Sequence, residues 1–167
     1  MSCGKLFLFC GLPGTGKTTL AKKLEKEKPI VRLCPDEWVY DLLADKSHIP
    51  EMDRIREIVE SRQWVQAKKL LQLGNTVLLE NGFWSIEERE RYRTEAKNIG
   101  AEITIYLFKA DLELLKHRLA KRNAEAPKGV FNIPMENIEK WYSEFEVPSL
   151  EELKRYDNYT IIENKNE

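Results

Sequence analysis

The feature that most constrains this chain is a glycine-rich segment near its start, which runs from Gly11 to Thr18 and reads GLPGTGKT. It follows an apolar run at Lys5–Cys10 and precedes a stretch whose apolar residues have helical spacing. The segment fits the pattern G-x-x-x-x-G-K-[ST] with one additional glycine. A strand that turns through glycines into a helix is typical of an α/β protein, so this segment favours that fold class.

The same spacing is suited to binding phosphate. Glycines let successive backbone N–H groups point inward, and a helix that begins near Lys17 directs its positive end to the same place. Lys17 can reach the β- and γ-phosphates of a nucleotide, while the Thr18 hydroxyl can ligate Mg²⁺. We therefore predict ATP and Mg²⁺ as the cofactors. The loop residues predicted to bind the nucleotide are Gly11, Pro13, Gly14, Thr15, Gly16, Lys17, Thr18 and Thr19.

Four further apolar runs predict the other strands of the sheet. Each is apolar at consecutive positions, as expected for parallel strands covered by helices on both faces. The runs alternate with longer stretches of helical spacing, a pattern typical of an open parallel sheet with right-handed crossovers. The five strands are predicted at Lys5–Cys10, Ile30–Leu33, Thr76–Leu79, Ile103–Phe108 and Tyr159–Ile162.

The helices are marked by apolar spacing and by their first residues. Ser85 and Ser149 each stand three residues before a Glu and form capping boxes. The predicted helices cover Thr18–Lys28 and Glu51–Leu73, and three others open at Ser85, Asp111 and Ser149. The least periodic stretch, Asn123–Asn132, is expected to be a mobile loop.

Length and composition predict one globular domain over residues 1–167, with 42% apolar and 33% charged residues. Three cysteines without a pairing pattern, and no apolar run of about 18 residues, lead us to expect a cytoplasmic protein that does not enter a membrane. The net charge of -1 conceals +4 up to Ile133 and -5 from Pro134 onward. This split favours local binding of a polyanionic nucleotide over coating of nucleic acid.

Two acidic residues follow predicted strands, at the edge where an open α/β sheet places its chemistry. Asp36 follows the second strand in CPDEW, and Glu80 ends the third in VLLENG. Asp36 is suited to accept the proton of an acceptor hydroxyl, although it can equally cap a helix that begins before Trp38. Glu80 is suited to hold Mg²⁺, directly or through a water molecule, since a carboxylate at the end of an apolar strand needs a partner.

Arg118 and Arg122 stand four residues apart on the helix that Asp111 opens, so they share one face. A guanidinium there can stack on adenine or neutralise charge on a transferred phosphoryl group. The alternative is an ordinary solvated helix face, because Lys116, His117 and Lys121 lie on the same helix.

Four segments together resemble the small P-loop kinases: GLPGTGKTTL, PDEW, VLLENGFWSIEERE and IYLFKADLELLKHRLAKRN. That group includes the chloramphenicol phosphotransferases, polynucleotide 5′-kinases, zeta-toxin kinases, and gluconate and shikimate kinases. The resemblance covers roughly Lys5 to Ile162. It implies a three-layer P-loop NTPase fold of the nucleoside-kinase type, with strand order 2-3-1-4-5 and a short lid at about 123–133.

The resemblance also implies roles for individual residues. Asp36 falls where these kinases carry the base that activates the acceptor hydroxyl. Arg118 would contact the adenine or the phosphates, and Arg122 would close over the phosphates with the lid. Lys17 completes the predicted catalytic set. Glu80 departs from the pattern, because the third strand of these kinases more often ends in Asp; its longer side chain makes a contact with Mg²⁺ through water plausible.

The acceptor is less constrained than the nucleotide. Aromatic residues gather near the predicted site, where they suit a small organic acceptor or a stacked base, or simply pack helices on the sheet. These residues are Trp38, Tyr40, Phe83, Trp84, Trp141 and Tyr142. Arg62 lies close to the apolar stripe of its predicted helix, which suggests an inward charge that holds an anionic acceptor or pairs with an acidic side chain.

These observations predict an ATP-dependent kinase that transfers the γ-phosphate to a hydroxyl of a small molecule. Three alternatives stay open: a polynucleotide 5′-hydroxyl kinase, a zeta-toxin-like kinase of an activated sugar, and a nucleotide-binding regulatory ATPase that is not a kinase. The sequence does not specify the acceptor, the choice of ATP or GTP, or the oligomeric state.

Overall fold

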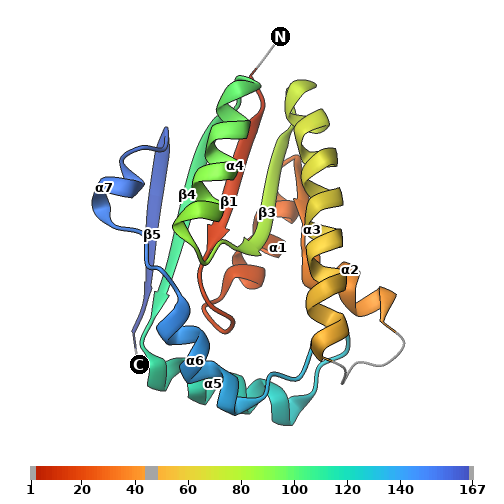
Figure 1. Ribbon diagram of the computed structural model, residues 1–167, viewed down its shortest axis with the longest axis vertical. Coiled ribbons are helices and arrows are strands. Elements are labelled where there is room, and N and C mark those ends of the chain that lie inside the picture. Colours follow the sequence, from red (N-terminus) through yellow and green to blue (C-terminus); the bar gives the residue numbers. More distant parts are fainter. Residues whose placement is uncertain (1–2, 44–48, 166–167) are drawn as a thin grey trace.

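A computed structural model describes residues 3–43 and 49–165. Its centre is a five-stranded sheet in which all paired strands are parallel, in the order β2-β3-β1-β4-β5 (Figure 1). This confirms the predicted α/β class and strand order. The strands are β1 (Lys5–Cys10), β2 (Ile30–Leu33), β3 (Thr76–Gly82), β4 (Glu102–Ala110) and β5 (Asn158–Asn164).

β1 and β2 have the predicted bounds, and the other strands are longer. β3 continues for three residues beyond Leu79 because the polar side chains there have partners. Glu80 contacts Thr18, and the Asn81 amide donates to the Tyr92 hydroxyl at 3.1 Å. The length of the hydrophobic run alone therefore underestimates the length of β3, the strand that carries Glu80.

Seven helices connect the strands in the described ranges. Ser85, Asp111 and Ser149 each accept a backbone N–H at the start of a helix, as their positions in the sequence predicted. The helices are α1 (Lys17–Glu27), α2 (Pro35–Leu42), α3 (Ile49–Gln72), α4 (Ile86–Asn98), α5 (Leu112–Glu125), α6 (Met135–Glu144) and α7 (Leu150–Leu153). In that part of the chain, no helix is both long and apolar enough to pass through a bilayer.

No bounds were predicted for two helices, α2 and α6; α2 entered only as the alternative in which Asp36 caps a helix. α2 begins at Pro35, where a missing N–H is harmless because the first turn of a helix has no internal partner for it. α6 begins after Pro134 and ends at Phe145. In the sequence each proline suggests an interruption of regular secondary structure, whereas in the structure it stands at the start of a helix.

The loop predicted at Asn123–Asn132 begins three residues later, because α5 continues through Glu125. The helix ends at Ala126, which has a left-handed conformation with φ of 42° and precedes Pro127. Asn123 bridges the following loop: its amide donates to the Ile133 carbonyl at 2.6 Å and accepts the Ile133 N–H at 3.0 Å. The segment between α5 and α6 is thus tied at its two ends.

Helices cover the two faces of the sheet, which gives three layers. α3, α4 and α7 pack on one face through residues that include Trp64, Tyr92 and Leu153. α1 packs on the other face through Ala21. The carboxyl ends of the central strands point toward α5 and α6 (Figure 1). The glycine-rich loop follows β1 at this end, so the fold brings the predicted site residues there.

Candidate active site

The glycine-rich loop joins β1 to the first turn of α1. Gly14 and Gly16 have φ of 84° and 89°, a left-handed region that favours glycine, and Gly16 is the N-cap of α1. A side chain at Gly14 would also meet the Leu119 side chain of α5 at 3.2 Å. The loop therefore needs glycine for its conformation and for its close contact with α5.

The Lys17 ammonium lies over this loop. Its Nζ donates to the Gly11 and Leu12 carbonyls at 2.8 and 2.7 Å. Burial lowers the pKa of Lys17 to about 8, an effect that the nearby Asp36 carboxylate opposes. A half-buried ammonium that is bonded only to backbone carbonyls is well placed to bind a phosphate.

Thr18 connects the loop to the end of β3. Its hydroxyl donates to Glu80 Oε1 at 2.8 Å, and Glu80 Oε2 forms an ion pair with Arg32 Nε at 2.6 Å. Burial raises the pKa of Glu80, while Arg32 and Thr18 oppose that shift. Arg32 is itself held by both oxygens of Glu37. Glu80 is thus fixed beside the loop by partners from two other elements, α1 and β2.

These residues fit a nucleotide with Mg²⁺. Thr18 and Glu80 bring a hydroxyl and a carboxylate oxygen together, which are the hard oxygen ligands that Mg²⁺ prefers. Such a site commonly uses one or two protein ligands together with phosphate oxygens. Thr15 and Thr19 flank these groups, Thr15 buried with its hydroxyl donating to the Leu12 carbonyl and Thr19 exposed in the first turn of α1.

Asp36 lies in the first turn of α2 and its side chain is 59% exposed. It forms an ion pair with Arg56 of α3, which also donates to the Asn81 carbonyl at 3.2 Å and to Glu60 at 2.9 Å. The alternative role of Asp36 as a helix cap is wrong, since Cys34 occupies that position and makes no side-chain cap. The carboxylate is therefore oriented by Arg56 and not by a backbone N–H at the cap.

The two arginines of α5 have different surroundings. Arg118 donates to the Gly14 carbonyl at 3.2 Å and to Asn164 at 2.9 Å. Asn164, at the end of β5, in turn donates to the Thr15 carbonyl at 3.1 Å. Arg122 Nε is buried without a protein hydrogen-bond partner among residues 3–43 and 49–165. Burial lowers the pKa of Arg122, and the Asp36 carboxylate opposes that shift.

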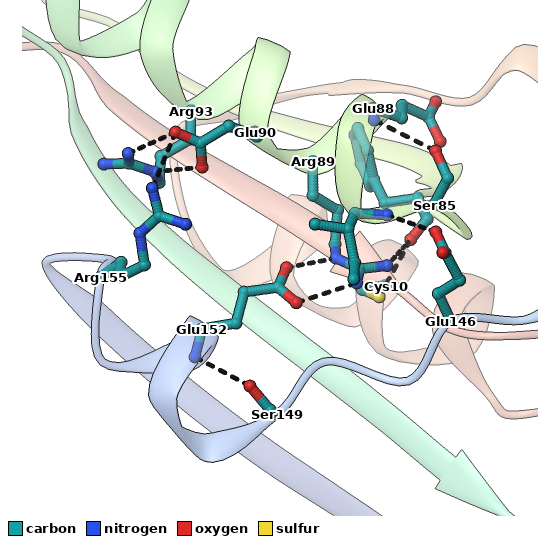
Figure 2. Close-up of polar contacts among 12 residues, drawn as sticks. Cys10, Ser85, Glu88, Arg89, Glu90, Arg93, Glu146, Ser149, Glu152 and Arg155 are labelled. Carbon is teal, nitrogen blue, oxygen red and sulfur yellow. Dashed lines mark hydrogen bonds and ion pairs between the residues drawn. The ribbon is translucent and has the colours of Figure 1, made fainter.

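The turn after β3 is strained and strongly anchored. Phe83 has φ of 51°, a left-handed conformation that is unfavourable for a side-chain-bearing residue. The fully buried Arg89 donates to the Phe83 carbonyl at 2.9 Å and binds both oxygens of Glu152 on α7 (Figure 2). Before the turn, the Gly82 carbonyl accepts the Gly11 N–H at 2.9 Å. The turn thus links the glycine-rich loop to the C-terminal part of the chain.

Thr18 joins Glu80 to the phosphate loop, and the Asp36 carboxylate lies close enough to Lys17 and Arg122 to raise the pKa of each. Arg62 is different: it is exposed, so the expectation of an inward charge there is wrong, and Arg56 has that position six residues earlier. Arg32, Arg56 and Arg89 were not singled out from the sequence. An arginine inside the apolar run of β2 is the one signal that could have identified Arg32.

The aromatic residues have mainly packing roles. Trp84 and Trp141 contact each other with ring centroids 5.7 Å apart, and Tyr40 contacts Phe131 at 5.3 Å. Phe83 is fully buried, whereas Trp38 remains 45% exposed on α2. Trp84 and Trp141 thus connect the turn after β3 to α6.

Parallel strand order, a glycine-rich loop between β1 and α1, and the Lys17–Thr18–Glu80 arrangement are typical of the P-loop fold. A family model described as AAA domain matches residues 6–148, and the chain belongs to that family. A comparison with curated protein sequences gives no match.

Solved structures share this fold. A candidate kinase from Chloroflexus aurantiacus has a TM-score of 0.77 at 19% identity, over 98% of this chain and 86% of that one. Kti12 of Chaetomium thermophilum, solved with ADP-AlF3, has a TM-score of 0.69 at 18% identity, with 97% and 90% covered. A gluconokinase from Sinorhizobium meliloti has a TM-score of 0.61 at 15% identity, with 100% and 86% covered. The expected likeness to P-loop kinases is confirmed at the level of the fold.

Proposed function

We propose that this protein is an ATP-dependent kinase that transfers a phosphoryl group to a hydroxyl of a small molecule. The observation that carries this proposal is the position of Asp36 near two cations of the predicted phosphate site. Its charge raises the pKa of Lys17 and of Arg122, and Arg56 forms an ion pair with it. A carboxylate so placed is suited to receive a proton next to a reacting phosphate.

The phosphate-binding side of the site would act by charge and position. Lys17 exchanges its loop carbonyls for phosphate oxygens, and the backbone N–H groups at the start of α1 bind the same oxygens. Arg122 stabilises the charge of the transferred group, for which its unpartnered, buried Nε is suited. Thr18 and Glu80 would hold Mg²⁺, which neutralises phosphate charge when bound.

Asp36 would supply the base. As the acceptor oxygen bonds to the γ-phosphorus, the bond from phosphorus to the β–γ bridging oxygen breaks and ADP leaves with that electron pair. Asp36 receives the hydroxyl proton on its carboxylate. Arg56 keeps the carboxylate turned toward the site, because its guanidinium is fixed at the same time by Glu60 and by the Asn81 carbonyl.

The adenine side and the lid complete the proposal. Arg118 and Asn164 lie beside the loop at Gly14 and Thr15, where a planar guanidinium can stack on a base. The segment between α5 and α6 would act as a lid, since it directly follows Arg122 and is tied back at Asn123. The ADP-AlF3 complex of the similar Kti12 structure supports nucleotide binding on this fold.

The test is transfer of labelled γ-phosphate from ATP to a panel of alcohols, amino sugars and oligonucleotides with free 5′-hydroxyl ends. We expect a small-molecule product that requires Mg²⁺ and is absent with Asp36→Asn. Labelled oligonucleotides beside inert small molecules would instead favour the polynucleotide kinase. ATP hydrolysis with no labelled acceptor of any kind would overturn the kinase proposal in favour of a regulatory ATPase.

A further inference from the structure

A set of polar side chains between α3 and α4 has no part in nucleotide binding. Its members come from α3, from the end of β3 and from the start of α4, and Arg56 joins the set to Asp36. We call it the α3–α4 polar cluster: Arg56, Glu60, Gln63, Asn81 and Glu88. Arg56, Glu60 and Gln63 follow helical spacing on one face of α3, and Arg56 connects this face to Asp36 and to the Asn81 carbonyl.

The cluster has more negative than positive charge. Glu60 has Arg56 as its ion-pair partner at 2.9 Å, but Arg56 is shared with Asp36. Burial and the charge of Glu60 together raise the pKa of Glu88 to about 7, against the opposing effects of the exposed Arg91 and of Arg56. Burial also raises the pKa of Glu60. Asp36, Glu60 and Glu88 therefore share the two guanidiniums of Arg56 and Arg91, which leaves an excess of carboxylates in the cluster.

Two buried amides point to a ligand with hydrogen-bond donors. Gln63 is 1% exposed, and neither its Oε1 nor its Nε2 has a protein hydrogen-bond partner among the described residues. Asn81 is 7% exposed; its amide nitrogen is used by Tyr92, while its Oδ1 has no such partner there. Burying polar atoms without hydrogen-bond partners is unfavourable. The unpartnered amide atoms of Gln63 and Asn81 therefore indicate that a polar ligand binds there. The atoms still available are mainly acceptors.

We propose that the α3–α4 polar cluster is the acceptor-binding site and that it selects an alcohol which also carries a protonated amine, such as an amino sugar or an aminocyclitol. This inference rests on the kinase function proposed above. Glu60 and Glu88 bind the ammonium group, and the Gln63 and Asn81 amides bind neighbouring hydroxyls. The reacting hydroxyl then lies beside Asp36, because Arg56 joins Asp36 to this cluster.

The same charges argue against an anionic acceptor. Arg56 is already engaged by Asp36 and Glu60 and is also bonded to the Asn81 carbonyl. A phosphate or carboxylate on the acceptor would then face Glu60 and Glu88 without a free cation from the cluster. This charge pattern favours an ammonium group over the phosphodiester chain of a nucleic acid.

The first experiment compares acceptors that differ only at the amine. The full chain is assayed with ATP and Mg²⁺ on D-glucosamine, 2-deoxystreptamine and other members of the same two classes, each with its N-acetyl and N-methyl derivative. N-acetylation removes the charge, whereas N-methylation keeps it and adds bulk. We expect N-acetylation to lower kcat/KM by about 10- to 100-fold, and N-methylation to lower it by less than about threefold.

The second experiment locates the effect in the cluster. Glu88→Gln is expected to reduce the preference for the amine over its N-acetyl form by about tenfold. Glu87→Gln is the matched control, because Glu87 is the exposed neighbour on the same helix turn, and it should leave the preference unchanged. Glu88→Asp keeps the charge and should restore most of the preference, which separates a binding role from a folding defect.

The outcomes are distinct. Equal or better transfer to neutral sugars, to gluconate or to oligonucleotide ends would overturn this inference and leave the kinase proposal intact. A preference for the amine that Glu88→Gln and Glu60→Gln do not alter would also overturn it, by placing the amine elsewhere. Failure to label every acceptor, with ATP still bound, would overturn the kinase proposal and this inference together.

Discussion

The two sides of the candidate site are built in opposite ways. The nucleotide side uses one contiguous loop, Gly11–Thr18, and presents donors and cations. The proposed acceptor side draws its groups from α2, α3, β3 and α4, and presents mainly carboxylates and amide oxygens. Asp36 belongs to both sides, because its charge acts on Lys17 and Arg122 and it forms an ion pair with Arg56.

The two kinds of ligand explain this difference. A polyanion needs many converging N–H groups, which a single strand-to-helix turn provides from neighbouring residues. A small polar acceptor needs a few side chains at defined positions, and these come from elements that can vary independently. The nucleotide side therefore has a strong sequence signature, and the acceptor side has almost none.

The largest effect is expected at Lys17, because its ammonium is the main cation of the nucleotide side. Lys17→Ala should lower phosphoryl transfer by about 10³-fold or more, since a buried cation at the phosphates is lost. The measurement is initial-rate transfer at saturating acceptor. Lys23→Ala, an exposed lysine of the same helix, is the control and should stay near the wild-type rate. A comparable loss in both variants would contradict the role of Lys17.

The junction between the two sides is tested next. Asp36→Asn should lower kcat by about 10²- to 10³-fold, because the base is lost while the geometry is kept. The affinity for ATP, measured by titration with a fluorescent analogue, should change by less than about twofold. Asp41→Asn, an exposed aspartate of the same helix, should behave as wild type. Full activity of Asp36→Asn would assign the proton to another group.

The turn after β3 serves both sides, and its anchor should affect stability more than chemistry. Glu152→Gln leaves Arg89 buried with an uncompensated charge and should lower the free energy of unfolding by about 3 kcal/mol, roughly 10²-fold in the equilibrium constant. Urea denaturation measures this change. The exposed Glu151→Gln should differ from wild type by about 0.5 kcal/mol or less, and an equal loss in both would refute the buried pair as the anchor.

The smallest effect concerns pH and the nucleotide side alone. The pKa of Lys17, which burial lowers to about 8, should rise when phosphates surround the ammonium. ATP binding above pH 8 must then take up a proton, so affinity should fall by up to about tenfold for each pH unit above 8. Calorimetry in buffers with different ionisation enthalpies measures the uptake. Lys17→Met should abolish it, and uptake that persists in this variant would implicate another group.

Particular residues show how far sequence reasoning reaches. Ser85 and Asp111 were recognised because a cap depends on residues three positions away. Asp36 and Glu80 were recognised because they directly follow apolar runs, although their contacts with Arg56 and Arg32 could not be predicted. Arg62 was chosen wrongly for Arg56, because the orientation of a long helix about its axis depends on its packing against β3 and α2.

The sequence by itself determined the fold class, the strand order implied by the family resemblance, and the phosphate loop. It could do so because hydrophobic periodicity, caps and glycine conformations are local properties. The tertiary structure alone decided which charges pair with one another: Arg32 with Glu80, Arg56 with Asp36, and Arg89 with Glu152. Such pairs join residues from 20 to 63 positions apart, and only packing of the helices on the sheet brings them together.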